Sequence, residues 1–235
     1  MTVEVALVAK QLVREMFPQA RAALLAGSAA RGSMTTTSDL DIVVVLSGPP
    51  APYRETIHYE DWTVELFVRD EASLTCWYER EVSAFHPVLA TMIASGVVLR
   101  DQGGASQLQE EASAILDSGP RPLTDDELAS RRYALTDNLL DLEVVEHDVD
   151  EHDAVASLVL SRTAELFLLS SGSWLGTGKW LVRRLRETNS EVATELMSAH
   201  RVAIVSGNSS RLIAVADLVL NRVGGRMTEG YKVSD

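Results

Sequence analysis

The sequence predicts an α/β (α+β) N-terminal domain with a small mixed sheet, followed by an all-α helical-bundle domain. Two observations predict this order. The first half contains several short, strand-sized runs of β-branched and aromatic residues, among them residues 40–46. After about residue 102 the strand signals end, and apolar residues recur at helical spacing to the C-terminus. We therefore expect two domains, residues 1–104 and residues 105–235.

The N-terminal domain is expected to open with an amphipathic helix over residues 3–16, which Pro18 ends. A short apolar strand over 21–26 follows, and then a Gly-Ser turn. Residues 40–46 are expected to form a central strand, because they are almost continuously apolar. The remaining elements are strands over 53–59 and 62–68, helices over 70–80 and 85–95, and a short edge strand over 97–99.

The second half is expected to be helical throughout. Thr124 and Glu127 have the spacing of a capping box, which marks the start of one helix. The Gly- and Pro-containing residues 118–122 are the best candidate linker. The expected helices cover about 105–117, 124–150, 153–171, 179–187, 190–206 and 209–223.

Composition and charge limit the functional classes. The chain has 235 residues, 46% of them hydrophobic and 23% charged, which is typical of a globular protein. No apolar run approaches the roughly 18 residues of a membrane span, so we expect a cytoplasmic protein without membrane contact. The net charge of −13 disfavours general nucleic-acid binding, because an acidic chain repels phosphate backbones. The single cysteine, Cys76, is interpreted as a buried thiol on the apolar face of a helix.

Asp39 and Asp41 are the first candidates for chemistry. Side chains alternate along a strand, so these two carboxylates point the same way, while Leu40 and Ile42 point into a core. Two carboxylates on one face repel each other, and a divalent cation between them removes that penalty. Hard oxygen ligands of this kind suit Mg²⁺ together with substrate phosphates.

Glu65 is the third candidate, since it is a charged residue in an otherwise apolar strand and needs a partner there. If this strand pairs beside residues 40–46, Glu65 completes a cluster with Asp39 and Asp41. Two metal ions about 4 Å apart could then hold a phosphoryl group during displacement. The alternative is that Glu65 pairs with an arginine.

Gly27 and Ser28 lie where a strand ends and a helical turn begins. Backbone N–H groups at such a point bind phosphate, and the Ser28 hydroxyl adds a donor. Arg31, three residues further along, can contact a phosphate or a carboxylate.

The whole stretch, Gly27-Ser28-x-x-Arg31-Gly32 followed by Ser38-Asp39-Leu40-Asp41, resembles the signature of the polymerase-beta-like nucleotidyltransferase superfamily. Glu65 resembles the third carboxylate of that superfamily. The resemblance covers roughly the first 70 residues. It is specific because a phosphate turn, an Asp-x-Asp pair at the start of an apolar strand and a later acidic residue all agree.

The resemblance implies a nucleotidyltransferase. A nucleoside triphosphate, expected to be ATP, would bind with Mg²⁺, expected to be two ions. Its nucleotide would be transferred to an acceptor hydroxyl with release of pyrophosphate. Gly27 and Ser28, with Arg31 and Ser38, would bind the nucleotide. Asp39, Asp41 and Glu65 would bind metal, with Glu65 serving the second ion or the deprotonation of the acceptor.

A catalytic domain followed by a helical domain is similar in outline to the aminoglycoside and lincosamide nucleotidyltransferases of antibiotic resistance. A small cationic acceptor also suits the acidic charge. Asp137 and Asp141, four residues apart on one face of a helix, are candidates for the acceptor side, either as a base or as a patch for a cation. The alternative for both is a solvated helix face. His147 and His152 are expected to be surface residues.

Lys179 follows a loop of residues 172–178 that contains three glycines. The loop is not a P-loop, because Ser or Thr is missing after the lysine. Lys179, at the expected start of a helix, could contact a triphosphate. The alternative is a turn between helices with Trp174 and Trp180 packed in the core.

Two other functions remain open on the sequence alone. One is nucleotidyl transfer to a protein or an RNA end, as in toxin–antitoxin systems, and the acidic charge argues against RNA. The other is a non-catalytic nucleotide-binding or regulatory protein, and the complete set Asp39, Asp41 and Glu65 argues against it. The chain could act as a monomer or a homodimer.

Overall fold

The computed structural model describes residues 2–145 and 148–232. It divides into two compact units, Met1–Ser118 and Gly119–Asp235. The boundary follows residue 118 and not the expected residue 104, because helix α5 (Ala105–Ser118) belongs to the first unit. Ala105, Leu108 and Ala112 of α5 are buried in the same core as one face of the sheet.

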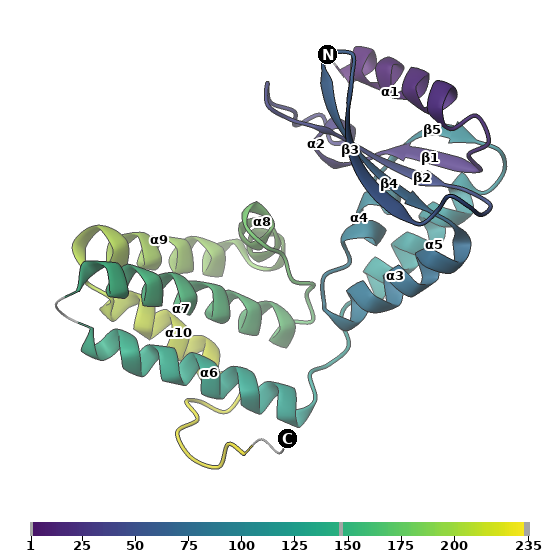
Figure 1. Cartoon of the computed structure of the whole chain (residues 1–235). Helices are drawn as coiled ribbons and strands as arrows, with labels where there is room; N and C mark the ends of the chain where they lie inside the picture. The colour runs from purple at the N-terminus through teal and green to yellow at the C-terminus, as the bar shows by residue number, and fades with distance from the viewer. Residues whose placement is uncertain (1, 146–147, 233–235) are drawn as a thin grey trace. The chain divides into compact units, whose positions relative to one another are not determined.

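The first unit contains a mixed sheet, as the sequence predicts (Figure 1). Among the described residues its strand order is β3-β4-β2-β1-β5. β2 is parallel to β4, and the other neighbouring pairs are antiparallel. The predicted central strand is therefore confirmed as β2, and the predicted edge strand as β5. The strands are β1 (Ala22–Leu25), β2 (Leu40–Val45), β3 (Tyr53–Tyr59), β4 (Trp62–Arg69) and β5 (Val97–Asp101).

Helices cover both faces of this sheet (Figure 1). Leu40 and Ile42 of β2 pack in the core under α1, as expected, whereas Val43 and Val45 pack on the opposite face. Because side chains alternate along a strand, Asp41 lies on the second face. The helices of this unit are α1 (Thr2–Met16) on the first face, α3 (Glu71–Ser83), α4 (Val88–Ala94) and α5 on the second, and the short α2 (Gly27–Ala30) after β1.

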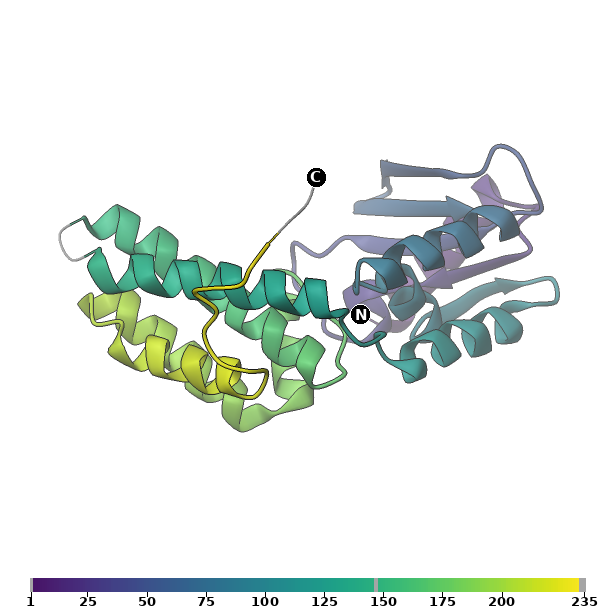
Figure 2. The same cartoon turned by 90° about the horizontal axis from the view of Figure 1, so that it is seen from below.

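The second unit is a helical bundle, also as predicted (Figure 2). α7 contacts α6, α8, α9 and α10, so it forms the centre of the bundle. The predicted capping box is present, with Glu127 N–H donating to Thr124 Oγ1 at 3.2 Å and Thr124 N–H donating to Glu127 Oε2 at 2.9 Å. The helices are α6 (Asp125–Val144), α7 (Val149–Ser170), α8 (Lys179–Thr188), α9 (Ser190–Ser206) and α10 (Ser210–Asn221). None of the helices within the described ranges is long and apolar enough to cross a membrane.

The expected helix over 124–150 is wrong at its C-terminal end. α6 ends at Val144 and α7 begins at Val149. Asp148 is the N-cap of α7, and its carboxylate accepts hydrogen bonds from the backbone N–H groups of Asp150 and Glu151. An aspartate that takes up these N–H groups stabilises the start of a new helix, so one helix does not continue through it.

Two interpretations of single residues are also wrong. Cys76 is exposed on α3, because the helix turns its Leu74 side into the core and Cys76 lies on the other side. His152 is buried, because its Nε2 lies 2.7 Å from the hydroxyl of Ser209 at the start of α10. His147, the other expected surface histidine, lies outside the described residues.

Candidate active site

Three carboxylates meet on the sheet face opposite α1. Asp39, Asp41 and Glu65 each offer one oxygen atom, and these atoms lie within 4.8 Å of one another. β2 and β4 run parallel, and Asp41 is the register partner of Glu65. Asp39 precedes the first residue of β2 and reaches the cluster from the loop. The pairing of strand 62–68 beside residues 40–46, on which the sequence hypothesis depended, is thus confirmed.

Within this cluster, the carboxylate of Asp41 has a raised pKa. Burial raises the pKa of Asp41 to about 6, and the charges of Asp39 and Glu65 add to the rise, while Arg31 and Arg54 oppose it. A cation beside Asp41 would lower this pKa again, because an opposite charge stabilises the carboxylate. All three carboxylates are only half-buried, so an ion from solution can reach them.

Gly27 fits against Asp41 more closely than any other residue type could. It has a φ of +63°, in the left-handed region that favours glycine. A Cβ at this position would overlap Oδ2 of Asp41 and lie 2.8 Å from its Cγ. The backbone N–H of Ala26, one residue earlier, donates to the carbonyl of Asp41 at 2.8 Å. The Gly-Ser turn and Asp41 therefore form one packed unit.

The other predicted nucleotide-binding residues of the first unit lie between Gly27 and Asp41 in the sequence. Ser28 is half-buried in the first turn of α2, and Arg31 is the C-cap of that helix. Ser38 has a structural contact of its own: its hydroxyl accepts a hydrogen bond from the Thr35 N–H at 2.9 Å, and its N–H donates to the Thr35 carbonyl at 3.1 Å. These bonds close the turn that leads into Asp39.

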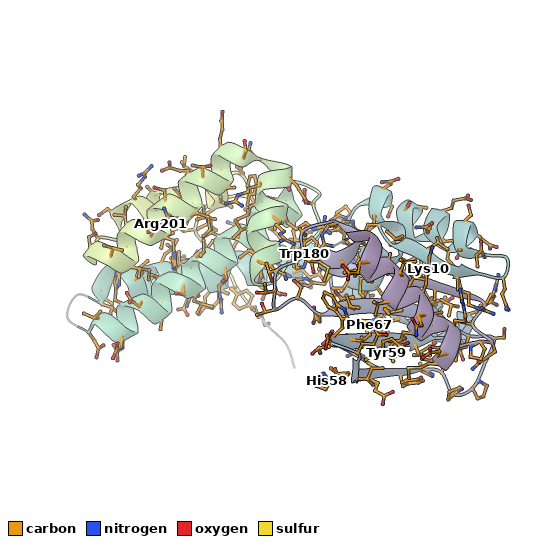
Figure 3. All side chains as sticks on the ribbon, turned by 90° about the horizontal axis from the view of Figure 1, so that it is seen from above. Lys10, His58, Tyr59, Phe67, Trp180 and Arg201 are labelled. Carbon is orange, nitrogen blue, oxygen red and sulfur yellow. The ribbon has the colours of Figure 1, made fainter. Side chains whose placement is uncertain are left out.

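Arg54 is a neighbour of the cluster that the sequence analysis did not single out. Its Nη2 donates to Oε2 of Glu65 at 2.7 Å, and its Cζ lies 4.7 Å from the centre of the Phe67 ring, which Figure 3 labels. Glu65 therefore does pair with an arginine, as the alternative interpretation held. It also lies beside Asp39 and Asp41 in the carboxylate cluster. Arg54 carries no motif signal, since it is an exposed charge on an alternating strand.

Three predicted site residues belong to the second unit. Lys179 is the first residue of α8, and its side chain is exposed. Asp137 and Asp141 are exposed on α6, one helical turn apart. The loop before Lys179 is tightly packed, since Trp174 is buried and a Cβ on Gly176 would lie 2.7 Å from the backbone of Trp180. The roles of Lys179, Asp137 and Asp141 stay predictions.

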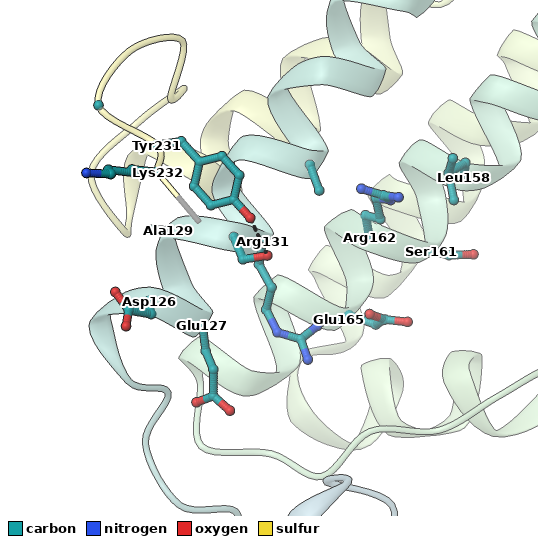
Figure 4. Close-up of a pocket in the computed structure, with 13 residues that line it drawn as sticks. Asp126, Glu127, Ala129, Arg131, Leu158, Ser161, Arg162, Glu165, Tyr231 and Lys232 are labelled. Atoms are coloured by element: carbon teal, nitrogen blue, oxygen red, sulfur yellow. Dashed lines mark hydrogen bonds and ion pairs between the residues drawn. The ribbon is translucent and has the colours of Figure 1, made fainter. Parts of the chain in front are cut away.

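The second unit also has a pocket of about 1020 Å³, formed by α6, α7 and residues 230–232 (Figure 4). It is lined by side chains of both charges. Two of its carboxylates are paired with arginines: Arg131 donates to Glu165 at 3.1 Å, and Arg121 donates to Glu127 at 2.6 Å. The pocket is lined by residues of this unit alone, whereas the carboxylate cluster belongs to the first.

The family comparison concerns the part of the chain that holds the carboxylates. Residues 8–89 match the family model described as the nucleotidyltransferase domain. Over these residues the first unit is thus similar to a nucleotidyltransferase domain. The matched span contains Gly27, Ser28 and all three carboxylates, and it ends before the second unit begins. The expected enzyme class, nucleotidyltransferase, is thus confirmed, and it implies a nucleotide substrate.

Comparison with solved structures includes the following remote likeness. A nucleotidyltransferase-like protein from Exiguobacterium sibiricum 255-15 is similar to this chain with a TM-score of 0.47 and 12% identity, over 93% of this chain and 74% of that one. No curated protein matches the chain. The nucleotidyltransferase assignment therefore rests on residues 8–89.

Proposed function

We propose that this protein transfers a nucleoside monophosphate, AMP from ATP, to a hydroxyl group of a small cationic acceptor such as an aminoglycoside-like antibiotic. The observation that carries the proposal is the convergence of Asp39, Asp41 and Glu65 within a nucleotidyltransferase domain. The reaction forms a bond between the acceptor oxygen and the α-phosphorus. The bond from that phosphorus to the bridging oxygen breaks, and pyrophosphate leaves.

The three carboxylates fit divalent metal. They are hard oxygen ligands, their oxygens lie within 4.8 Å of one another, and burial and mutual repulsion disfavour the charged form of Asp41. Asp39, Asp41 and Glu65 would hold Mg²⁺, for which we propose two ions. When bound, these ions would neutralise charge on the phosphoryl group and polarise its oxygens.

The residues of the Gly-Ser turn suit the triphosphate. The first N–H groups of a helix have no partner within that helix, and we assign those of Gly27 and Ser28, at the start of α2 and beside Asp41, to its phosphates. Arg31 adds a positive charge close enough to act on Asp41. Ser38 holds the turn before Asp39. We assign Lys179 a further phosphate contact on the basis of its place at a helix start after a glycine loop.

The acceptor assignment rests on charge. The chain has a net charge of −13, which favours a cationic small molecule over an anionic one. Asp137 and Asp141 offer an exposed pair of carboxylates on one face of α6 for such a molecule. A carboxylate near the acceptor hydroxyl would take its proton, and Glu65 is the candidate within the cluster. We also propose a cytoplasmic location, where nucleoside triphosphates are available.

Calorimetric titration tests the proposal. The purified protein is titrated with ATP, GTP, CTP and UTP, each with and without Mg²⁺, and the same titrations are made with Asp39→Ala. We expect Mg²⁺-dependent binding of ATP that Asp39→Ala loses, followed by transfer to an aminoglycoside with release of pyrophosphate. Equal binding by Asp39→Ala would contradict the metal assignment. Binding of another triphosphate, or transfer only to a different acceptor, would contradict the substrate assignment alone.

A further inference from the structure

Arg54 lies on the same sheet face as the three carboxylates. Its strand, β3, pairs antiparallel with β4, and Thr56 is the register partner of Glu65. The alternate residues Tyr53, Ile57 and Tyr59 pack against the core under α1, so Arg54 and Thr56 face the other way. Arg54 is thus the diagonal neighbour of Glu65, a separation that a long side chain bridges.

The hydrogen bond from Arg54 occupies one carboxylate oxygen of Glu65, which is a proposed metal ligand. Its Nη2 lies 2.7 Å from Oε2 of Glu65, and stacking on Phe67, with 4.7 Å from Cζ to the ring centre, fixes the guanidinium from the side. A guanidinium and a divalent cation both seek the oxygens of this carboxylate and repel each other. Arg54 also remains 57% exposed while Glu65 is 23% exposed, so Arg54 can leave towards solvent.

We propose that Arg54 is a positioning residue that holds Glu65 in place when the site contains no metal, and that it competes with a divalent cation for this carboxylate. The inference rests on the proposed function, because it assumes that Asp39, Asp41 and Glu65 bind metal. In this proposal Arg54 lowers the affinity of the site for a divalent cation, because an ion that binds both oxygens of Glu65 must first displace the guanidinium. Metal binding by the free enzyme is therefore weaker than the three carboxylates alone would give.

The test is a titration of the full chain with Mn²⁺ in the absence of nucleotide, followed by calorimetry or by the electron paramagnetic resonance of free Mn²⁺. Arg54→Gln removes the competing charge, and we expect it to bind Mn²⁺ about fivefold more tightly than the wild type, the factor that corresponds to loss of an exposed ion pair. Arg54→Lys retains a cation and should stay close to the wild type. General damage to the site would lower affinity, so the expected change has the opposite sign.

Two further variants separate this inference from the function on which it rests. Arg14→Gln removes an exposed positive charge from α1, on the opposite side of the sheet, and should leave affinity unchanged. Asp41→Asn should bind Mn²⁺ much more weakly. Unchanged or weaker binding by Arg54→Gln, with binding still lost in Asp41→Asn, would overturn the role of Arg54 and leave the metal site standing. Absence of Mn²⁺ binding in the wild type would overturn both.

Discussion

Gly27 and Asp41 are packed so closely that no side chain fits between them: a Cβ on residue 27 would overlap Oδ2 of Asp41. One of these residues belongs to the turn proposed to bind phosphate, and the other to the cluster proposed to bind metal. The two halves of the proposed site are thus joined by a direct contact. A change in the turn must displace the carboxylate.

Gly27→Ala should therefore damage metal binding as well as phosphate binding. We expect at least about a tenfold loss of Mn²⁺ affinity, equivalent to about 1.4 kcal/mol, because Asp41 must move away from the new Cβ. Gly32→Ala is a matched control, since Gly32 has a φ of +64° but nothing lies within 4 Å of its Cβ position. Both variants should lose about 1 kcal/mol of stability from backbone strain. Equal metal affinity in the two variants would refute the steric coupling.

Asp41→Asn should make the metal-free protein more stable at high pH. Burial raises the pKa of Asp41 from 3.8 to about 6, so the folded state favours the protonated carboxyl. This contribution to stability is complete below about pH 4 and is lost as the pH rises through about 6. Thermal unfolding in a chelating buffer should show Asp41→Asn melting above the wild type at pH 8, with the difference disappearing near pH 4. Asp61→Asn, in the exposed turn after β3, is the control. A lower melting temperature for Asp41→Asn at pH 8 would contradict the prediction.

Asp39→Ala and Asp41→Ala should abolish metal-dependent transfer and leave the fold intact. Loss of a metal ligand removes several kcal/mol of charge stabilisation, so we expect at least about a 100-fold fall in kcat/KM. Release of pyrophosphate measures the rate, and circular dichroism checks the fold. Glu55→Ala is a suitable control, because Glu55 is an exposed carboxylate of β3 whose alternation places it with the α1-side residues. Full activity in either aspartate variant would exclude that residue from the metal site.

Asp137→Ala and Asp141→Ala test the proposed acceptor side. If these carboxylates attract a cationic acceptor, each change should raise the KM for the acceptor about three- to fivefold, the effect of losing one exposed ion pair. The affinity for the triphosphate should not change. Glu191→Ala, which removes an exposed carboxylate from the first turn of α9, is the control. If the KM for the acceptor matches the wild type in both aspartate variants, the two residues form only a solvated helix face.

The sequence was most informative where local signals decide the structure. The nearly continuous apolar run of β2 predicted its central place, and the Thr124–Glu127 spacing predicted a helix start that the structure contains. The convergence of Glu65 with Asp39 and Asp41 could be stated only conditionally, because strand order depends on long-range packing. Once β4 lies parallel to β2, the register brings Glu65 beside Asp41.

The remaining differences arise from contacts between distant segments. Arg54 could not be recognised, since its contact with Glu65 depends on the register of a hairpin and on one diagonal across it. His152 is buried because the start of α10 packs beside the start of α7, far away in sequence. Cys76 could have been placed better: two residues after an inward Leu74, a helix has turned by about 200° and points the side chain outward.

Within the described residues, β3 is an edge strand of the sheet and has β4 as its one neighbour. The other side of its backbone therefore has no neighbouring strand. Such an edge can pair with a strand of another molecule, and charged residues on the edge oppose that self-association. Arg54 and Glu55 are the charged residues of this strand. Arg54 therefore combines two proposed roles, since it contacts Glu65 and places a charge on an exposed sheet edge. A replacement that released Glu65 for metal would also remove one of the charges on this edge, and we expect it to favour pairing of β3 with a strand of another molecule.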